Sequence, residues 1–357
     1  MLTEQIVIDA LRKVKDPELG VDVITLEMIK QIKVSGSVVS LTLELTTPAC
    51  PVREKFETDV RTAVAAIPGV SRVDLATGAK VKASRPFEQQ GIAGVRNVVA
   101  IASGKGGVGK TTLSVNLAAA LALEGASVGL MDADIYGPNV PLMMGLKQLP
   151  PMKDGKIVPA ENFGVKVMSM GFLIREQDAV VWRGPMLHGA VNKFLKEVLW
   201  DDLDYLLVDL PPGTGDVQLS LSQSIPLSGA LIVTTPQDVA LQDVRRSIAM
   251  FEKVKVPLLG VVENMSTFIC PHCSKPTDIF SKGGGVQAAE ALKIPFLGEV
   301  PLMTEVREGA DEGHPIVLTH PDSPAARALR EIARKLAAQV SILTAKEQER
   351  FKTEWKV

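Results

Sequence analysis

The sequence predicts an α/β fold, in which a domain with a mostly parallel sheet follows a small α/β domain. Residues 96–345 hold seven short apolar runs, most of them separated by helical segments, which is typical of parallel strands covered on both faces. The first 84 residues have a different order of helices and strands. Residues 85–95 contain Pro, Gly and polar residues without periodicity, so they are expected to link the two domains, and residues 346–357 to form a tail.

The smaller domain is expected to have the order α-β-β-α-β. Residues 3–13 have the apolar spacing of a helix, and IKVSGSVVSLTLEL alternates apolar and polar side chains around Ser35-Gly36-Ser37, as a hairpin does. A second helix is expected over residues 52–67, where Pro68-Gly69 stops it. The run VSRVDLAT that follows has the composition of a strand.

The larger domain is built from apolar runs that we expect to be strands. In chain order they are NVVAIAS, SVGLMDAD, VKVMSMG, YLLVDLP, ALIVTTP, LLGVVENM and FLGEVP. The first is followed by the helical segment TTLSVNLAAALALEG. In an open parallel sheet, ligands bind at the carboxyl ends of the strands, so the residues that end each run are candidates for function.

Composition excludes several classes of protein. The formal net charge is −2, so no overall basic field is available to hold a nucleic acid. No apolar run approaches the roughly 20 residues that span a bilayer, and the N-terminus has no features of a signal or transit peptide. Three cysteines are too few for a disulfide framework and suit a reducing compartment. We expect a cytoplasmic protein with no nucleic-acid or membrane partner.

The segment Gly104–Thr111, GKGGVGKT, satisfies the pattern G-x-x-x-x-G-K-S/T between an apolar run and a helix. Its glycines let backbone N–H groups converge on phosphate oxygens, and the helix N-terminus adds partial positive charge. Lys110 is expected to contact the β- and γ-phosphates and Thr111 to bind Mg²⁺. The predicted ATP-binding residues of this segment are Gly104, Lys105, Gly106, Gly107, Val108, Gly109, Lys110, Thr111 and Thr112.

Two other runs end in acidic residues. YLLVDLPPGTGD places Asp209 at the end of an expected strand, where it can hold Mg²⁺, and Gly213 can offer its N–H to the γ-phosphate. GLMDADIYGPN ends another strand with Asp132 and Asp134. Asp134 is the candidate for orienting the attacking water; the alternative is that these acids cap the next segment.

Cys270 and Cys273 form a C-x-x-C pair in STFICPHCSKP. A redox dithiol, half of a zinc site, half of an iron–sulfur site and a buried structural pair are all compatible with the spacing. A redox pair would open a helix, whereas Pro276 follows closely here. Two chains meeting about a two-fold axis would supply four thiolates, which suits tetrahedral zinc or a [4Fe–4S] cluster.

The first lysine of the phosphate loop, Lys105, has no obvious role within one chain, because Lys110 already neutralises the phosphates. The loop resembles the deviant Walker A sequence of the signature-lysine class of P-loop NTPases, which includes the nitrogenase iron protein, the arsenite-pump ATPase and partitioning ATPases. In that class the first lysine reaches the nucleotide of the facing subunit. The resemblance implies a homodimer in which Lys105 supplies positive charge to the ATP of the partner chain. Together with Lys110 and Asp134, it completes the expected catalytic set.

GKGGVGKTT, MDADIYGPN, VDLPPGTGD, VVENMS and CPHC together resemble the Mrp/NBP35 family of iron–sulfur cluster carriers over residues 96–340. DPELG and TTPACP in the first domain are similar to the MIP18 module. The resemblance implies a [4Fe–4S] cluster bridged by Cys270 and Cys273 of two chains, and slow ATP hydrolysis coupled to cluster loading or delivery. It also implies a cluster-donor scaffold and apoprotein recipients as partners, and places Asn264 at the adenine edge.

Two other functions share part of this evidence. A partitioning-type ATPase switch would use the same phosphate loop but gives no reason for CPHC, and a zinc-stapled regulatory ATPase differs only in its metal. Cys50, in TTPACP, is either a reactive thiol that contacts the cluster or a small apolar residue of the core.

Overall fold

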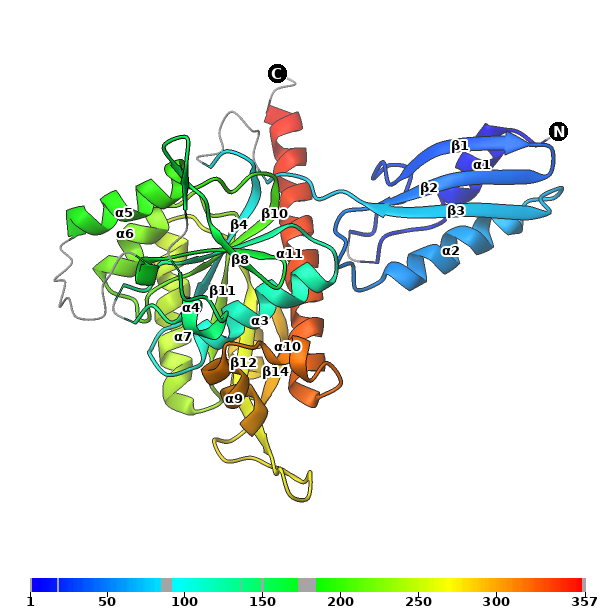
Figure 1. Cartoon of the computed structure of the whole chain (residues 1–357). Helices are drawn as coiled ribbons and strands as arrows, with labels where there is room; N and C mark the ends of the chain where they lie inside the picture. The colour runs from blue at the N-terminus through cyan, green and yellow to red at the C-terminus, as the bar shows by residue number, and fades with distance from the viewer. Residues whose placement is uncertain are drawn as a thin grey trace. The chain divides into compact units, whose positions relative to one another are not determined.

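The computed structural model describes residues 2–17, 19–84, 92–135, 137–148, 151–172 and 184–354 (Figure 1). Residues 85–91 of the expected linker and 355–357 of the expected tail lie outside this set. The chain divides into two compact units, one formed by Met1–Lys82 with Ser341–Val357 and the other by Ala83–Val340. No helix in the described ranges is both long enough and apolar enough to cross a membrane.

The first unit has the expected order of elements: α1 (Glu4–Leu11), β1 (Ile29–Ser35), β2 (Val38–Leu45), α2 (Arg53–Ala65) and β3 (Arg72–Ala79). β2 lies in the middle of the sheet, antiparallel to β1 and parallel to β3. Alternate side chains of β2 are buried, and they form one core with apolar residues of α1 and α2. Because a strand has a period of two residues, this alternation fixes which face of the sheet the helices cover.

The second unit contains the remaining elements, except for the part of the last helix that follows Val340, which belongs to the first unit. Its strands are β4 (Val95–Ala102), β5 (Val128–Asp132), β6 (Met152–Lys153), β7 (Lys156–Ile157), β8 (Ala160–Asn162), β9 (Val165–Ser169), β10 (Leu203–Asp209), β11 (Gly229–Thr234), β12 (Leu258–Ile269), β13 (Pro276–Thr277) and β14 (Phe296–Leu302). Its helices are α3 (Lys110–Leu123), α4 (Val140–Met143), η2 (Met170–Phe172), α5 (Gly184–Glu197), α6 (Asp216–Ser224), α7 (Asp238–Lys253), α8 (Gly284–Leu292), α9 (Thr304–Glu312), α10 (Ile316–Thr319) and α11 (Pro324–Glu354).

The main sheet is mostly parallel, as expected. The strands follow the order β13-β12-β11-β4-β10-β5-β9-β8, and β14 pairs with β12. Only β8 and β13 pair antiparallel to their neighbours. All seven apolar runs are strands of this sheet, and the central ones are almost completely buried, which explains why they lack alternation.

The sheet brings three chain segments to one edge. β4 lies between β10 and β11, and β5 lies on the other side of β10. Asp209 of β10 is in register with Asp132 of β5 and with Ile101 of β4. Because these strands are parallel, the phosphate loop after β4 and both acidic segments meet at their carboxyl ends.

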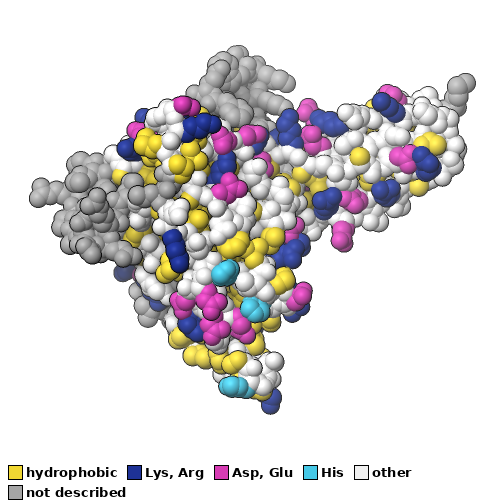
Figure 2. All heavy atoms as spheres, in the orientation of Figure 1, with side chains coloured by type: hydrophobic (Ala, Val, Ile, Leu, Met, Phe, Trp, Pro, Cys, Tyr) yellow, Lys and Arg dark blue, Asp and Glu magenta, His cyan; other side chains and the backbone are white. Residues whose placement is uncertain are grey.

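β12 is longer than the apolar run that predicts it. It continues to Ile269 and pairs with β13, so that Cys270 and Cys273 lie in the turn of a hairpin. This hairpin, yellow in Figure 1, extends away from the rest of its unit, and the space-filling view shows it standing out from the surface (Figure 2). The cysteine pair is therefore presented at the end of a strand that begins in the centre of the fold.

Candidate functional site

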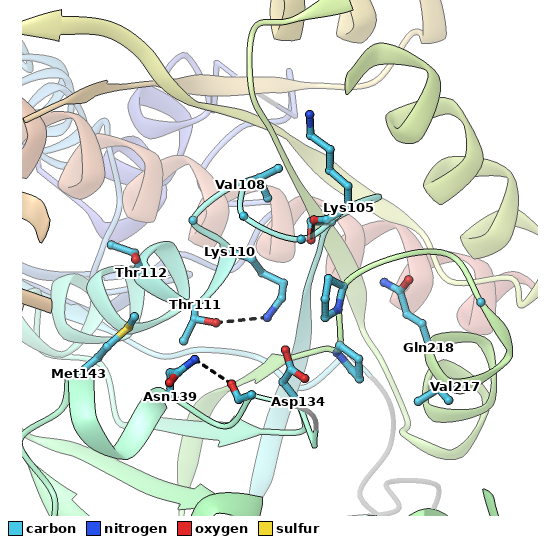
Figure 3. Close-up of a pocket in the computed structure, with 18 of the residues that line it drawn as sticks. Lys105, Val108, Lys110, Thr111, Thr112, Asp134, Asn139, Met143, Val217 and Gln218 are labelled. Atoms are coloured by element: carbon cyan, nitrogen blue, oxygen red, sulfur yellow. Dashed lines mark hydrogen bonds between the residues drawn. The ribbon is translucent and has the colours of Figure 1, made fainter. Parts of the chain in front are cut away.

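A cavity of about 630 Å³ lies at the carboxyl ends of β4, β5 and β10. Three segments line it: the phosphate loop, the segment after β5 and the segment from the end of β10 into α6. The lining residues are Ser103, Lys105, Gly106, Gly107, Val108, Gly109, Lys110, Thr111, Thr112, Asp134, Gly137, Asn139, Met143, Pro211, Pro212, Gly215, Asp216, Val217 and Gln218 (Figure 3). Most of the residues predicted to bind ATP thus share one cavity.

Two predicted ATP-binding glycines lie outside the lining. Gly104 packs against α7, where an added Cβ would come within 2.5 Å of the Asp243 Cβ. Gly213 donates its N–H to the Ser103 carbonyl at 2.9 Å. A contact between that N–H and a γ-phosphate stays a prediction, and it would require this hydrogen bond to open.

Lys110, Thr111 and Asp209 form a buried network at the base of the cavity. The Lys110 Nζ lies 2.7 Å from Asp209 Oδ2, and the Thr111 hydroxyl donates to the same oxygen at 2.7 Å. Ser114, one turn into α3, donates to the other carboxylate oxygen at 2.6 Å. Sequence reasoning missed Ser114, although its spacing from Lys110 places it on the same face of the helix.

The two acids after β5 have different surroundings. Asp132 is completely buried and accepts hydrogen bonds from the Ser169 hydroxyl and from the backbone N–H groups of Asp134 and Val140. Burial, together with the negative charge of Asp209, raises the pKa of Asp132 to about 8. Asp132 thus holds the start of α4, in agreement with the capping alternative, whereas Asp134 lines the cavity.

The two lysines of the loop point in different directions. Figure 3 shows the Lys110 amine directed toward Thr111 and Asp134, and the Lys105 side chain extending away from them. The Ser103 hydroxyl donates to the Lys105 carbonyl at 3.0 Å, and this hydrogen bond fixes the backbone of Lys105. The Lys105 amine therefore does not occupy the same part of the site as the Lys110 amine.

Asn264 of β12 contacts the phosphate loop. Its amide nitrogen donates to the Val108 carbonyl at 2.8 Å, and the side chain is mostly buried. Gly109 has a φ of +79°, and an added Cβ would come 2.2 Å from the Asn264 nitrogen, so glycine is required there. Asn264 is not among the cavity-lining residues, and its predicted contact with adenine stays a prediction.

Glu263, the residue before Asn264, was not predicted from the sequence, because the motif VVENMS does not indicate its hydrogen-bond partners. It is completely buried and accepts hydrogen bonds from the backbone N–H groups of Gly283 and Gly285, which begin α8. An added Cβ at Gly284 would lie 2.5 Å from the Pro236 carbonyl oxygen. A negative charge at a helix N-terminus is favourable, so Glu263 fixes α8 to β12 close to the phosphate loop.

Cys270 and Cys273 lie in a tight turn that suits a metal ligand pair. The Ser274 N–H donates to the Cys270 carbonyl at 2.8 Å and closes the turn. Hydrogen bonds from the backbone N–H groups of His272 and Cys273, and from the Cys273 thiol, lower the pKa of Cys270 and favour its thiolate. The pair does not open a helix, as a redox dithiol would, and Cys273 is exposed, so it is not a buried structural pair.

The described part of one chain offers these sulfurs no further ligands. No group of three or more His, Cys, Asp or Glu residues close enough to hold a metal ion occurs there. Cys50 belongs to the first unit, is half-buried and packs against the apolar core of that unit. The surroundings of Cys50 match the apolar alternative.

Comparisons with known proteins agree with this architecture. Residues 94–337 match the family model of the NUBPL iron-transfer P-loop NTPases, and residues 4–75 match that of an iron-sulfur cluster assembly protein. The iron-sulfur cluster carrier protein of Synechocystis sp. is 49% identical over 96% of this chain and 99% of its own length. That of Deinococcus radiodurans is 52% identical over 95% and 96%.

Solved structures are similar to about two thirds of this chain. A nucleotide-binding protein of Archaeoglobus fulgidus in complex with ADP is 38% identical, with a TM-score of 0.57 over 64% of this chain and 90% of that chain. The cell division ATPase MinD of Pyrococcus furiosus is 25% identical, with a TM-score of 0.52 over 67% and 97%. With its phosphate loop, its buried lysine–aspartate network and its C-x-x-C hairpin on one fold, the chain belongs to the family of NUBPL iron-transfer P-loop NTPases.

Proposed function

We propose that this chain is an ATP-hydrolysing iron–sulfur cluster carrier, which holds a [4Fe–4S] cluster between two copies and transfers it to apoproteins. The observation that carries the proposal is the exposed Cys270–Cys273 turn, whose hydrogen bonds favour a thiolate. The turn is at the end of β12, the strand that also contacts the phosphate loop through Asn264. One strand thus connects the nucleotide site with the cargo site.

The number of ligands supports a homodimer. A cubane cluster takes four thiolates, and each chain offers two. Apolar side chains flank the turn: Ile279 is 53% exposed, and Phe268 and Ile269 are partly exposed. A two-fold contact at this hairpin would bury them and complete the ligand set.

The nucleotide site fits ATP with Mg²⁺. Hydroxyl and carboxylate oxygens are ligands that Mg²⁺ prefers, and Thr111 and Asp209 lie together at the end of the phosphate loop. Bound Mg²⁺ would neutralise charge that develops on the phosphates. Lys110 pairs with Asp209 in this structure. With ATP and Mg²⁺ bound, the Lys110 amine would hold the phosphates and the Asp209 carboxylate would hold the metal.

The roles of Lys105 and Asp134 are inferred from the direction of the Lys105 side chain and from the position of Asp134 at the cavity. Lys105, which points away from Lys110, reaches the triphosphate of the partner chain and neutralises its transition state. Asp134 approaches the attacking water from the segment after β5. ATP then favours the arrangement of two chains in which Lys105 makes this contact, which is the differential affinity that a conformational switch needs.

Cluster transfer requires partner proteins and a reducing compartment. A cluster held by two thiolates from each chain at an interface is released when that interface rearranges, which suits transfer from a donor scaffold to apoprotein recipients. The cysteines of the chain form no disulfide in the structure, so they suit a reducing environment, which supports a cytoplasmic location.

Anaerobic reconstitution with iron and sulfide tests the proposal. The protein should bind about four irons per two chains and gain broad visible absorption. Cys273→Ala should lose both, whereas the neighbouring control Ser274→Ala should keep them. Equal iron in Cys273→Ala would remove the carrier function, and zinc in place of iron in protein purified without oxygen would favour the zinc-stapled alternative.

A further inference from the structure

Gln218 is the most unusual polar residue of the nucleotide cavity. Its side chain is 99% buried, since only 1% is exposed, and it lines the cavity from the first turn of α6. Neither its amide nitrogen nor its amide oxygen has a hydrogen-bond partner among the described residues. Figure 3 shows the amide on the cavity side of α6.

An unpaired buried amide lowers the stability of the fold, because its hydrogen bonds to water are lost and not replaced. Other polar side chains of α6 are satisfied locally: the hydroxyls of Ser222 and Ser224 donate to backbone carbonyls one turn earlier. Packing would be served as well by methionine or leucine at position 218. A glutamine kept unpaired in a cavity instead suits a ligand that pairs with it.

The position of Gln218 indicates which part of ATP it meets. Thr111 and Asp209, the proposed Mg²⁺ ligands, mark the place between the β- and γ-phosphates. The chain continues from Asp209 through Pro211 and Pro212 along the cavity wall into α6. Gln218 is therefore on the side of the terminal phosphate.

We propose that Gln218 is a catalytic residue that holds the attacking water against the γ-phosphate. Its nitrogen donates to a γ-phosphate oxygen and its oxygen accepts from the water. The water oxygen forms a bond to the γ-phosphorus, the bond to the bridging oxygen breaks with its electron pair leaving on ADP, and the water proton ends on the released phosphate. The amide does not take up the proton of the water, so it acts beside Asp134 and does not replace it.

The chemistry of an amide explains why glutamine occupies this position. One amide both donates and accepts, whereas a carboxylate only accepts and would repel the γ-phosphate. Gln218→Met keeps the length and volume but removes both hydrogen bonds. Gln218→Glu keeps an acceptor and adds negative charge. Gln223, exposed on the same helix, provides the matched control Gln223→Met.

Steady-state ATP hydrolysis by the full-length protein tests the proposal, which rests on the ATPase activity and not on cluster transfer. Gln218→Met and Gln218→Glu should lower kcat by about 100-fold, the typical effect of removing one preorganised donor from a transition state. Their affinity for ADP should stay within about twofold of the parent, because ADP lacks the γ-phosphate. Gln223→Met should match the parent in both. An unchanged kcat in Gln218→Met overturns the proposal.

Thermal unfolding separates this role from a structural one. Without nucleotide, Gln218→Met should melt no lower than the parent, because an unpaired amide has been removed. With Mg²⁺, ADP and aluminium fluoride, which imitates the phosphate under attack, the parent should gain the larger rise in Tm. A variant that melts lower without nucleotide and gains the same rise contradicts the proposal. Absence of ATP hydrolysis in the parent itself would instead count against the ATPase function.

Discussion

At the scale of single residues, the nucleotide site is held by a lysine–carboxylate pair that ATP has to separate. Lys110 and Asp209 are 5% and 0% exposed, so neither charge can be left alone at low cost. In the proposed complex, phosphate would pair with Lys110 and Mg²⁺ with Asp209, so that every buried charge would stay neutralised. Lys105 stands outside this network and is available for a neighbouring chain.

Replacing the two lysines should therefore have different effects. Lys110→Met leaves the buried Asp209 without a cation, so we expect the free energy of unfolding to fall by about 3–5 kcal/mol and ATP hydrolysis to be abolished. Lys105→Ala should unfold like the parent, keep much of its ATP binding and lose turnover. Urea unfolding and ATPase rates measure both. A fully active Lys105→Ala protein would refute the role across the interface.

Asp132 makes stability depend on pH. Its pKa is raised to about 8 in the folded protein, whereas an Asp in an unfolded chain titrates near 4. Between about pH 4 and pH 8 the folded state binds one proton more than the unfolded state. The contribution of Asp132 to the free energy of unfolding is therefore largest below about pH 4 and falls as pH rises toward about 8.

Asp132→Asn should remove that contribution. In urea unfolding without nucleotide at pH 5 to 8, the parent should lose stability with rising pH more steeply than the variant. Other titrating groups contribute equally to both proteins, so the difference in slope reports Asp132. Parallel slopes would show that Asp132 is ionised in the folded state throughout this range.

The phosphate loop and the nearness of Asp209 to it were predictable, because the spacing of these residues along the chain is typical of a P-loop. Lys110, Thr111 and Asp209 do meet in one buried network. Gln218 and Glu263 were not predictable, because their significance depends on burial and on partners far away in sequence.

At the scale of elements, β12 connects the phosphate loop, the start of α8 and the cysteine turn. Asn264 contacts the phosphate loop, and Glu263 before it holds the start of α8. Three residues after Asn264, the Thr267 hydroxyl donates to Asp278 at 2.9 Å across the hairpin, and the strand ends at Ile269, next to the cysteine turn. In the proposed carrier, β12 is the element that would pass a shift of the phosphate loop to Cys270 and Cys273.

Asn264→Ala tests the contact between strand and loop. The Val108 carbonyl would lose its donor, so we expect binding of both ATP and inorganic tripolyphosphate to weaken by about tenfold. Asn162→Ala, which removes a similar side-chain bond, to the Met144 carbonyl and not to the phosphate loop, is the control. Calorimetric titration measures both ligands. Weaker ATP binding with unchanged tripolyphosphate binding would assign Asn264 to adenine instead.

The seven main strands were predictable because buried parallel strands are apolar throughout. The short strands β6, β7, β8 and β13 were not, because two or three residues carry no periodic signal. The full length of β12 was also missed. Its last residues are held by pairing with β13 and β14, which the composition of LLGVVENM does not show.

At the scale of the whole molecule, the proposed function requires two copies of the chain. The described residues offer two sulfur ligands where a [4Fe–4S] cluster needs four, and Lys105 points away from Lys110. In the proposed homodimer, a second copy would supply the other two sulfurs and the nucleotide that Lys105 contacts.

The mass of the iron-loaded protein tests this pairing most directly. After the anaerobic reconstitution described above, sedimentation with Mg²⁺ and ATP should give the mass of two chains with about four irons, and Cys273→Ala should carry no iron. Iron bound at full occupancy by a single chain would contradict the account.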